Sequence, residues 1–252
     1  MNRDELCRYV GVTGFSLGHV EKDYLQHIVL GGLSRKSAGM LVFKGGTALQ
    51  KTGIVRRFSE DLDFTAREGL ALDRIVGAAR GALEAYNFPS EMDNRVDKEW
   101  TSGFRLKVRG PLYLGGRGLC SIRVEISRRE TVLLKPERKE LAPPYADILP
   151  YILDIMQNEE ILAEKLRAIS TRQKARDLYD AYMLLKKGVK VDVALAERKM
   201  DYYDRKLDVP ALLDRIELLK PGWERELDGI LEDVPPFKQV LAMVKSAIGG
   251  TR

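Results

Sequence analysis

The sequence has few cysteines, and their positions suggest neither a disulfide framework nor a metal site. Its 252 residues include two cysteines, Cys7 and Cys120, which form no CxxC pair. We therefore interpret both as small buried or partly buried side chains in a reducing compartment. No stretch is long and apolar enough to cross a bilayer, and the first residues, MNRDELCRYV, lack the apolar segment of a signal peptide. These absences predict a cytoplasmic protein with no membrane partner.

Internal repeats, low-complexity tracts and the nucleotide-binding motifs GxxxxGK[ST] and GxGxxG are absent as well. The composition is that of an ordinary globular chain, with 44% hydrophobic and 31% charged residues. Lysine and arginine number 42 against 37 acidic residues, a net charge of +5. This excess is compatible with a nucleic-acid partner but is weak evidence for one, because many proteins without such a partner are equally basic.

Hydrophobic periodicity predicts a mixed first part and a helical second part. Helices are expected over 20–33 and 71–87, and strands over 39–43 and around Asp61–Phe64. Alternating runs at 104–108 and 120–126, joined by a glycine-rich turn, predict an antiparallel pair with a basic outer face. Three prolines lie within 140–150, and the pattern after them is helical throughout. We therefore expect one domain at 1–145 and a helical domain at 146–252.

The stretch FKGGTALQKTGIVRRFSEDLDF carries the strongest chemical signal. Asp61 and Asp63 are two residues apart on a predicted strand, so both carboxylates project from one face. Oxygen ligands of this kind suit Mg²⁺ or Mn²⁺, usually shared with substrate phosphates. The turn Gly45-Gly46-Thr47 lets the backbone approach a phosphate and adds a hydroxyl. The simpler alternatives are a solvated strand face for the two aspartates and a tight strand-to-helix turn for Gly45-Gly46-Thr47. The occurrence of both features together nevertheless favours a nucleotidyltransferase core.

A third acid is expected on a neighbouring strand, because two-metal phosphoryl transfer needs a further ligand. Glu125, in RVEIS, is the candidate, since it lies on the outer face of its predicted strand. Its alternative is an ion pair with Arg123 or with a cation of the partner strand. Arg105, Lys107, Arg109 and Arg123 are then candidate contacts to triphosphate or RNA, although a plain solvated face explains each equally well.

A second constellation lies in EEILAEKLRAISTRQKARDLYDAYMLL. Lys165 and Arg172 are two helical turns apart, so they share a face if the helix runs through both. Asp177 and Asp180 are neighbours on the next predicted helix. An ordinary amphipathic helix pair with ion pairs explains this pattern too, whereas a lysine on a packed helix is also suited to neutralise a triphosphate.

The ordered set KGGTAL, RFSEDLDF, RVEIS, EEILAEKLRAISTR and RDLYD resembles the AbiEii/AbiGii toxin family of nucleotidyltransferases, within the DNA polymerase beta-like superfamily. The resemblance implies an α+β fold, in which a polymerase-beta-like nucleotidyltransferase domain with a mixed sheet precedes a helical C-terminal domain. It also implies transfer of NMP from an NTP to RNA, with the tRNA 3′ end as the expected acceptor, and a cognate antitoxin as a partner.

The residue patterns and the resemblance together point to three groups of site residues. The metal ligands would be Asp61, Asp63 and Glu125. Catalytic roles fall to these three acids together with Lys165 and Asp177. Nucleotide contacts are expected from Lys44, Gly45, Gly46, Thr47, Lys165 and Arg172.

Two other functions remain open at this point. One is a nucleotide-binding regulatory or partner-binding module without catalysis, against which the retention of the three acids and Lys165 argues. The other is nucleotidyl transfer to a protein or to a small-molecule hydroxyl.

Overall fold

The computed structural model describes residues 1–37 and 39–249, and their packing forms two compact units. Unit 1 comprises Met1–Ala48, Phe58–Thr131 and Pro136–Ile155. Unit 2 comprises Leu49–Arg57, Val132–Lys135 and Met156–Arg252. The last change of unit falls after Ile155, later than the expected boundary after residue 145, and two short internal segments join the second unit.

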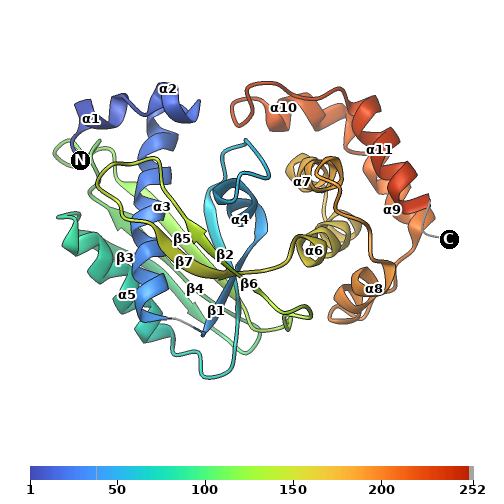
Figure 1. The fold of residues 1–252 in the computed structure, drawn as a ribbon, viewed down its shortest axis with the longest axis horizontal. Helices are drawn as coiled ribbons and strands as arrows, with labels where there is room; N and C mark the ends of the chain where they lie inside the picture. Colours follow the sequence, from blue (N-terminus) through green and yellow to red (C-terminus); the bar gives the residue numbers. More distant parts are fainter. Residues whose placement is uncertain (38, 250–252) are drawn as a thin grey trace. The chain divides into compact units, whose positions relative to one another are not determined.

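Unit 1 is built on a mixed seven-stranded sheet with the strand order β3-β4-β5-β2-β1-β7-β6 (Figure 1). Parallel pairing joins β1 to β7 and β2 to β5, and the other neighbours are antiparallel. The strands are β1 (Leu41–Lys44), β2 (Asp61–Ala66), β3 (Ser90–Asp97), β4 (Thr101–Val108), β5 (Cys120–Ser127), β6 (Glu137–Leu141) and β7 (Tyr151–Ile155).

Helices cover the apolar face of this sheet. The helices of unit 1 are α1 (Arg3–Cys7), α2 (Val10–Thr13), α3 (Leu17–Lys36) and α5 (Leu72–Ala85). Helix α3 packs on α5 and on strands β5 and β7 (Figure 1). Its residues from Val20 to Leu33 are buried, apart from Lys22. The inward residues of the strands, among them Phe43, Phe64 and Val124, form one core with α3 and α5. The opposite face of β2, β5 and β4 therefore carries their alternate, polar residues.

The predicted antiparallel pair is confirmed, because β4 and β5 pair from Thr101↔Ser127 to Val108↔Cys120. The expectation that everything after the prolines is helical is wrong for Tyr151–Ile155, which is strand β7 and pairs with β1. Prolines of the cluster lie in the connection between β6 and β7, inside unit 1. Their effect is therefore to shape a hairpin loop.

Unit 2 is helical in the part of the chain from 156 to 249. Helix α6 packs on α7, α8 and α9, and α11 packs on α7 and α9. Buried residues such as Leu166, Leu178 and Trp223 form its core. Its helices are α6 (Asn158–Thr171), α7 (Ala175–Lys186), α8 (Val193–Asp201), α9 (Val209–Glu217), α10 (Trp223–Leu227) and α11 (Phe237–Gly249), with a 3-10 turn at Lys220–Gly222. Helix α4 (Gly45–Lys51) begins in unit 1 and ends in unit 2.

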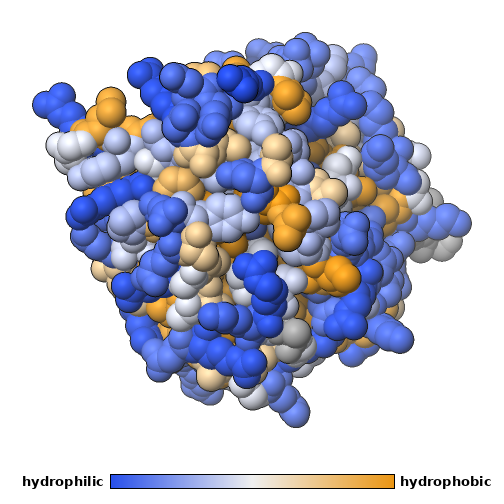
Figure 2. Space-filling model, turned by 60° about the vertical axis from the view of Figure 1, so that its left-hand side comes forward, coloured by the Kyte–Doolittle hydropathy of each residue, from blue (hydrophilic) through white to orange (hydrophobic). Residues whose placement is uncertain are grey.

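The cysteines differ from each other. Cys120 is buried in β5, as expected, whereas Cys7 is exposed, so the expectation of burial is wrong for Cys7. No helix among the described residues is long and apolar enough to span a membrane. Figure 2 shows that hydrophilic residues predominate on the face it draws, where apolar residues form separate patches.

Candidate functional site

The turn between β1 and α4 requires glycine for two reasons. Gly45 has φ +75°, a backbone conformation that side chains other than glycine rarely adopt. A Cβ at Gly45 would also lie 2.6 Å from Oδ2 of Asp63. The missing side chain therefore leaves the space in which the Asp63 carboxylate lies against the turn.

Thr47 ties the same turn to strand β2. Its side chain is fully buried, and its hydroxyl donates to the carbonyl oxygen of Asp61 and lies 2.8 Å from Oγ of Ser59. These contacts fix the start of β2 relative to the turn. The Thr47 hydroxyl thus has partners within the protein, which sequence reasoning did not anticipate.

Strand register brings the predicted acids together on the polar face. Lys44 on β1 lies opposite Asp63 on β2, and Asp63 lies beside Glu125 on β5. Paired residues of neighbouring strands point to the same face, so these three side chains form one row. Asp61 precedes Asp63 by two residues and shares this face. We call Asp61, Asp63 and Glu125 the acidic row.

The acidic row is partly open to solvent. Asp61 and Asp63 are half-buried, and the side chain of Glu125 is 52% exposed. Glu125 forms the ion pair with Arg123 that was the alternative expectation, at 3.1 Å. Lys44 is buried, and its amine lies 3.6 Å from a carboxylate oxygen of Glu130. Glu130 was not singled out from the sequence, because nothing in its local pattern marks a partner of Lys44.

The described residues contain no group of three or more His, Cys, Asp or Glu side chains placed to hold a metal ion. The acidic row nevertheless has the right chemistry for Mg²⁺. This ion is usually bound by one or two carboxylates together with substrate phosphates and water, and it rarely has an all-protein cage. The half-buried carboxylates of Asp61 and Asp63, which share one sheet face with Glu125, are a set of oxygen donors that fits such a group.

In unit 2, the residues of the second constellation form a chain of ion pairs. The Lys165 amine lies 2.9 Å from Asp177 and 2.7 Å from Asp180. Arg172 donates two N–H groups to Asp177, at 2.8 and 3.0 Å. Arg57 donates two to Asp180, both at 2.7 Å. We call Arg57, Asp180, Lys165, Asp177 and Arg172 the ion-pair chain.

The ion-pair chain is buried except at one end. Lys165, Asp177, Asp180 and Arg57 are all buried, whereas the side chain of Arg172 is 55% exposed. Three cations meet two carboxylates, which leaves a net charge of +1 among these five residues. Such burial is tolerated only because each carboxylate contacts two cations.

Burial and charge have opposite effects on the pKa values of this cluster. Burial by itself lowers the pKa of Lys165, but the carboxylates of Asp180 and Asp177 outweigh it and hold the pKa above its usual value. For Asp177, burial raises the pKa, but Lys165 and Arg172 outweigh it and the pKa lies well below the usual range. The pKa of Asp180 is lowered in the same way, by Arg57 and Lys165 against burial. All five groups are therefore charged at neutral pH.

The local structure corrects one sequence argument. Helix α6 ends at Thr171, and Arg172 has extended backbone angles, so the helix does not run through both cations. Lys165 and Arg172 meet through Asp177 instead. Arg57 was missed, because its partner Asp180 lies 123 residues away in the sequence.

The structure thus gathers the predicted residues into two groups. Unit 1 contains Lys44, Gly45, Gly46 and Thr47 together with the acidic row. Unit 2 contains Lys165, Arg172 and Asp177.

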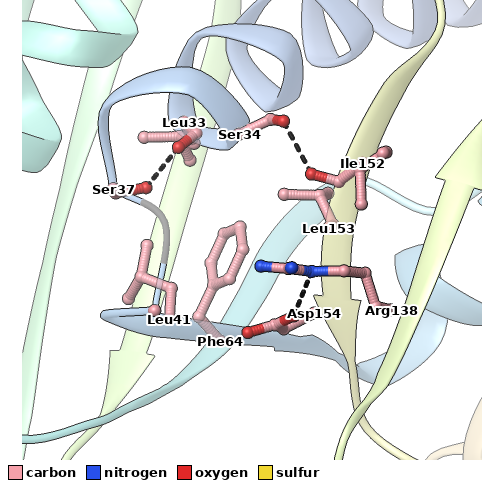
Figure 3. A pocket seen from close by; sticks show the side chains of 10 residues that line it. Leu33, Ser34, Ser37, Leu41, Phe64, Arg138, Ile152, Leu153 and Asp154 are labelled. Atoms are coloured by element: carbon pink, nitrogen blue, oxygen red, sulfur yellow. Dashed lines mark hydrogen bonds and ion pairs between the residues drawn. The ribbon is translucent and has the colours of Figure 1, made fainter.

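A further cavity of about 220 Å³ lies at the end of α3 (Figure 3). Its apolar lining includes Leu41, Phe64 and Leu153, which belong to the core face of the sheet. The Arg138 guanidinium lies 3.5 Å from the Asp154 carboxylate beside it. Because the acidic row points from the opposite face, this cavity is separate from the candidate site.

Comparison with known proteins adds independent evidence. A family model described as "Nucleotidyl transferase AbiEii toxin, Type IV TA system" matches residues 30–243. A search of curated proteins found no match. Among solved structures, JHP933 from Helicobacter pylori is 20% identical, with a TM-score of 0.63 over 93% of this chain and 92% of that chain. MenT4, a nucleotidyltransferase toxin from Mycobacterium tuberculosis H37Rv, is 19% identical, with a TM-score of 0.62 over 100% of this chain and 99% of that chain.

These structural likenesses show a shared α+β fold, consistent with the mixed sheet and the C-terminal helices. The family match covers most of the sequence and includes every predicted site residue. The chain therefore belongs to the AbiEii family of nucleotidyltransferase toxins of type IV toxin–antitoxin systems.

Proposed function

We propose that this protein transfers NMP from an NTP to RNA, with the 3′ end of tRNA as the acceptor. The observation that carries the proposal is the acidic row, whose three carboxylates share one partly exposed sheet face beside the Gly45 turn. Like charges gathered on one sheet face repel each other, and bound cations offset this repulsion. Membership of the family supports an NTP as the donor.

Asp61 and Asp63, with Glu125 beside them, would hold Mg²⁺ or Mn²⁺. When bound, such an ion neutralises phosphate charge and favours attack on the α-phosphorus. The protein contributes by fixing these carboxylates: Thr47 anchors the start of β2, and the glycine turn borders Asp63.

The donor phosphates would lie at Lys44, Gly45, Gly46 and Thr47. Gly45 allows the backbone to approach a phosphate closely, and the first N–H groups of α4 have no partner within the helix. The buried amine of Lys44, held by Glu130, adds positive charge. Since the Thr47 hydroxyl has partners in the protein, its share in binding rests on its backbone.

The chemistry is a displacement at the α-phosphorus. The 3′-hydroxyl oxygen of the RNA forms a bond to this phosphorus, while the bond from phosphorus to the bridging oxygen breaks. Pyrophosphate leaves with that electron pair. The Glu125 carboxylate accepts the hydroxyl proton, a role that suits an exposed acid of the row.

In unit 2, we give Lys165 and Arg172 the role of balancing phosphate charge, as the family resemblance implies. Asp177 is then a positioning residue, because it contacts both cations. A cognate antitoxin, implied by the type IV system, is the further partner in this proposal.

The test is a transfer assay on the purified chain with Mg²⁺, total tRNA and each α-labelled NTP in turn. We expect label in tRNA together with release of pyrophosphate. Asp61→Ala should reduce transfer roughly 10²–10³-fold or more, because it removes stabilisation of charge at the reacting phosphate. Glu84→Ala, which removes an exposed carboxylate on α5, serves as the control and should transfer normally. Label in protein, or no transfer with any NTP, would contradict the proposal.

A further inference from the structure

A second cavity, of about 210 Å³, opens on the polar face of the sheet in unit 1. Its lining includes Asn94 on β3, Gly103 and Arg105 on β4, and Arg123 and Glu125 on β5. We call it the Gly103 pocket. It shares Glu125 with the acidic row, so it adjoins the candidate site directly.

Glycine at position 103 keeps this part of the sheet face open. Gly103 lies opposite Glu125 in the register and thus continues the line from Lys44 through Asp63. A Cβ at Gly103 would approach the carbonyl oxygen of Val124 to 2.5 Å, so no side chain is accommodated there. The row of side chains formed by Lys44, Asp63 and Glu125 therefore ends at Gly103, next to the carboxylate of Glu125.

Two arginines flank the pocket. Arg105 and Arg123 lie directly opposite each other on β4 and β5, an arrangement that is unfavourable for like charges. Their ion pairs, with Asp93 at 3.4 Å and with Glu125 at 3.1 Å, offset this only partly, because both arginine side chains stay more than a third exposed, at 35% and 43%. A phosphate between them would receive two forked donors.

The strand order indicates on which side of the reacting phosphate this pocket would lie. The acidic residues of β2 stand between the Gly45 turn, which follows β1, and the pocket on β4 and β5. Attacking and leaving oxygens in phosphoryl transfer lie roughly in line on opposite sides of the phosphorus. If pyrophosphate leaves toward the Gly45 turn, the attacking hydroxyl arrives from the side of the Gly103 pocket.

We infer that the Gly103 pocket binds the terminal nucleotide of the acceptor RNA, with a backbone phosphate held by Arg105 and Arg123. This inference rests on the proposed function and adds to it a binding site for the acceptor. Arg123 and Glu125 lie two residues apart on β5, a separation of about 7 Å. That distance suits a terminal nucleotide that has its phosphate at the arginines and its 3′-hydroxyl near Glu125. The volume, below the roughly 300 Å³ of typical small-molecule sites, suits part of one nucleotide.

The experiment compares steady-state transfer by wild type, Arg105→Gln and Arg95→Gln, with the KM for total tRNA and for the NTP measured separately. Arg95 is the matched control, because it lies on the neighbouring strand β3, pairs with Asp73 and is 38% exposed, but does not line the pocket. We expect Arg105→Gln to raise the KM for tRNA about tenfold, the loss of one charge-assisted contact, with little change in the KM for NTP. Arg105→Lys should recover part of this loss, since it restores the charge without the fork.

Three outcomes would overturn the inference. Arg105→Gln could raise the KM for NTP and leave the KM for tRNA unchanged, which would indicate that the pocket binds the donor nucleotide. It could match Arg95→Gln, which would leave only a general basic surface. A wild-type protein that transfers nothing to tRNA would contradict the proposed function itself, and the inference with it, so the two failures are distinguishable.

Discussion

The two units place their acids in opposite environments. In unit 1, Asp61 and Asp63 are half-buried and Glu125 is largely exposed, on a sheet face that no apolar core covers. In unit 2, Asp177 and Asp180 are buried, and each receives a two-nitrogen fork from an arginine and the amine of Lys165. Acids with complete sets of cationic partners stabilise a fold, whereas acids gathered on an open face are available to bind cations and substrate.

This comparison separates stability from activity. Removing a buried member of the ion-pair chain leaves its buried partners with less compensation, which costs several kcal/mol. Removing a carboxylate from the acidic row relieves repulsion between like charges that share one sheet face. The two groups should therefore respond differently to the same kind of substitution.

The largest effect on stability is expected for Asp180→Asn. This change keeps the shape of the side chain but leaves Arg57 and Lys165 with one carboxylate fewer, both in buried positions. We expect the free energy of unfolding to fall by about 3–5 kcal/mol. Urea unfolding followed by the fluorescence of Trp223, buried in unit 2, measures it.

Two controls sharpen this result. Asp214→Asn removes an exposed acid from α9 in the same unit and should change stability by less than about 0.5 kcal/mol. Arg172→Gln removes the exposed end of the ion-pair chain and should cost at most about 1 kcal/mol. A loss for Asp180→Asn no larger than that for Arg172→Gln would show that burial does not govern this cluster.

A smaller effect on the free energy of unfolding is expected when the pH is lowered. Because the pKa values of Asp177 and Asp180 are lowered in the folded state, their stabilisation is complete above the unfolded pKa of about 3.9 and is lost as the pH falls through the folded values. The stability gap between wild type and Asp180→Asn should stay constant from pH 8 to about 5 and narrow below about 4. Urea titrations over this range test the sign. A gap that widens on acidification would contradict it.

Much of the framework of unit 1 was predictable from local pattern. The alternation of Phe104, Leu106 and Val108 against basic residues predicted β4, and the same signal predicted β5. Strand β3 could not be found this way, because most of its residues are exposed and no apolar alternation marks it. Strand β7 was missed because five residues after a proline carry little signal, and its partner β1 is distant in the sequence.

For the candidate site, the spacing of residues in the sequence predicted the identity of the candidate residues better than it predicted the contacts between them. Two aspartates on one strand face followed from the two-residue period, and the register then placed Glu125 beside Asp63. No spacing rule pairs Arg57 with Asp180 or assigns the Thr47 hydroxyl to Asp61, since both contacts depend on the packed tertiary structure. Long-range ion pairs and buried hydroxyl contacts are the part that sequence alone leaves undetermined.

The central claim is that the acidic row is required for chemistry and not for stability, whereas the buried members of the ion-pair chain are required for the fold. The most direct test measures nucleotide transfer to tRNA and the free energy of unfolding in parallel for Asp63→Asn. The account predicts a loss of transfer of roughly 10²–10³-fold or more, with stability unchanged within about 0.5 kcal/mol or slightly raised. Full transfer by this variant, or a loss of stability as large as that expected for Asp180→Asn, would contradict it.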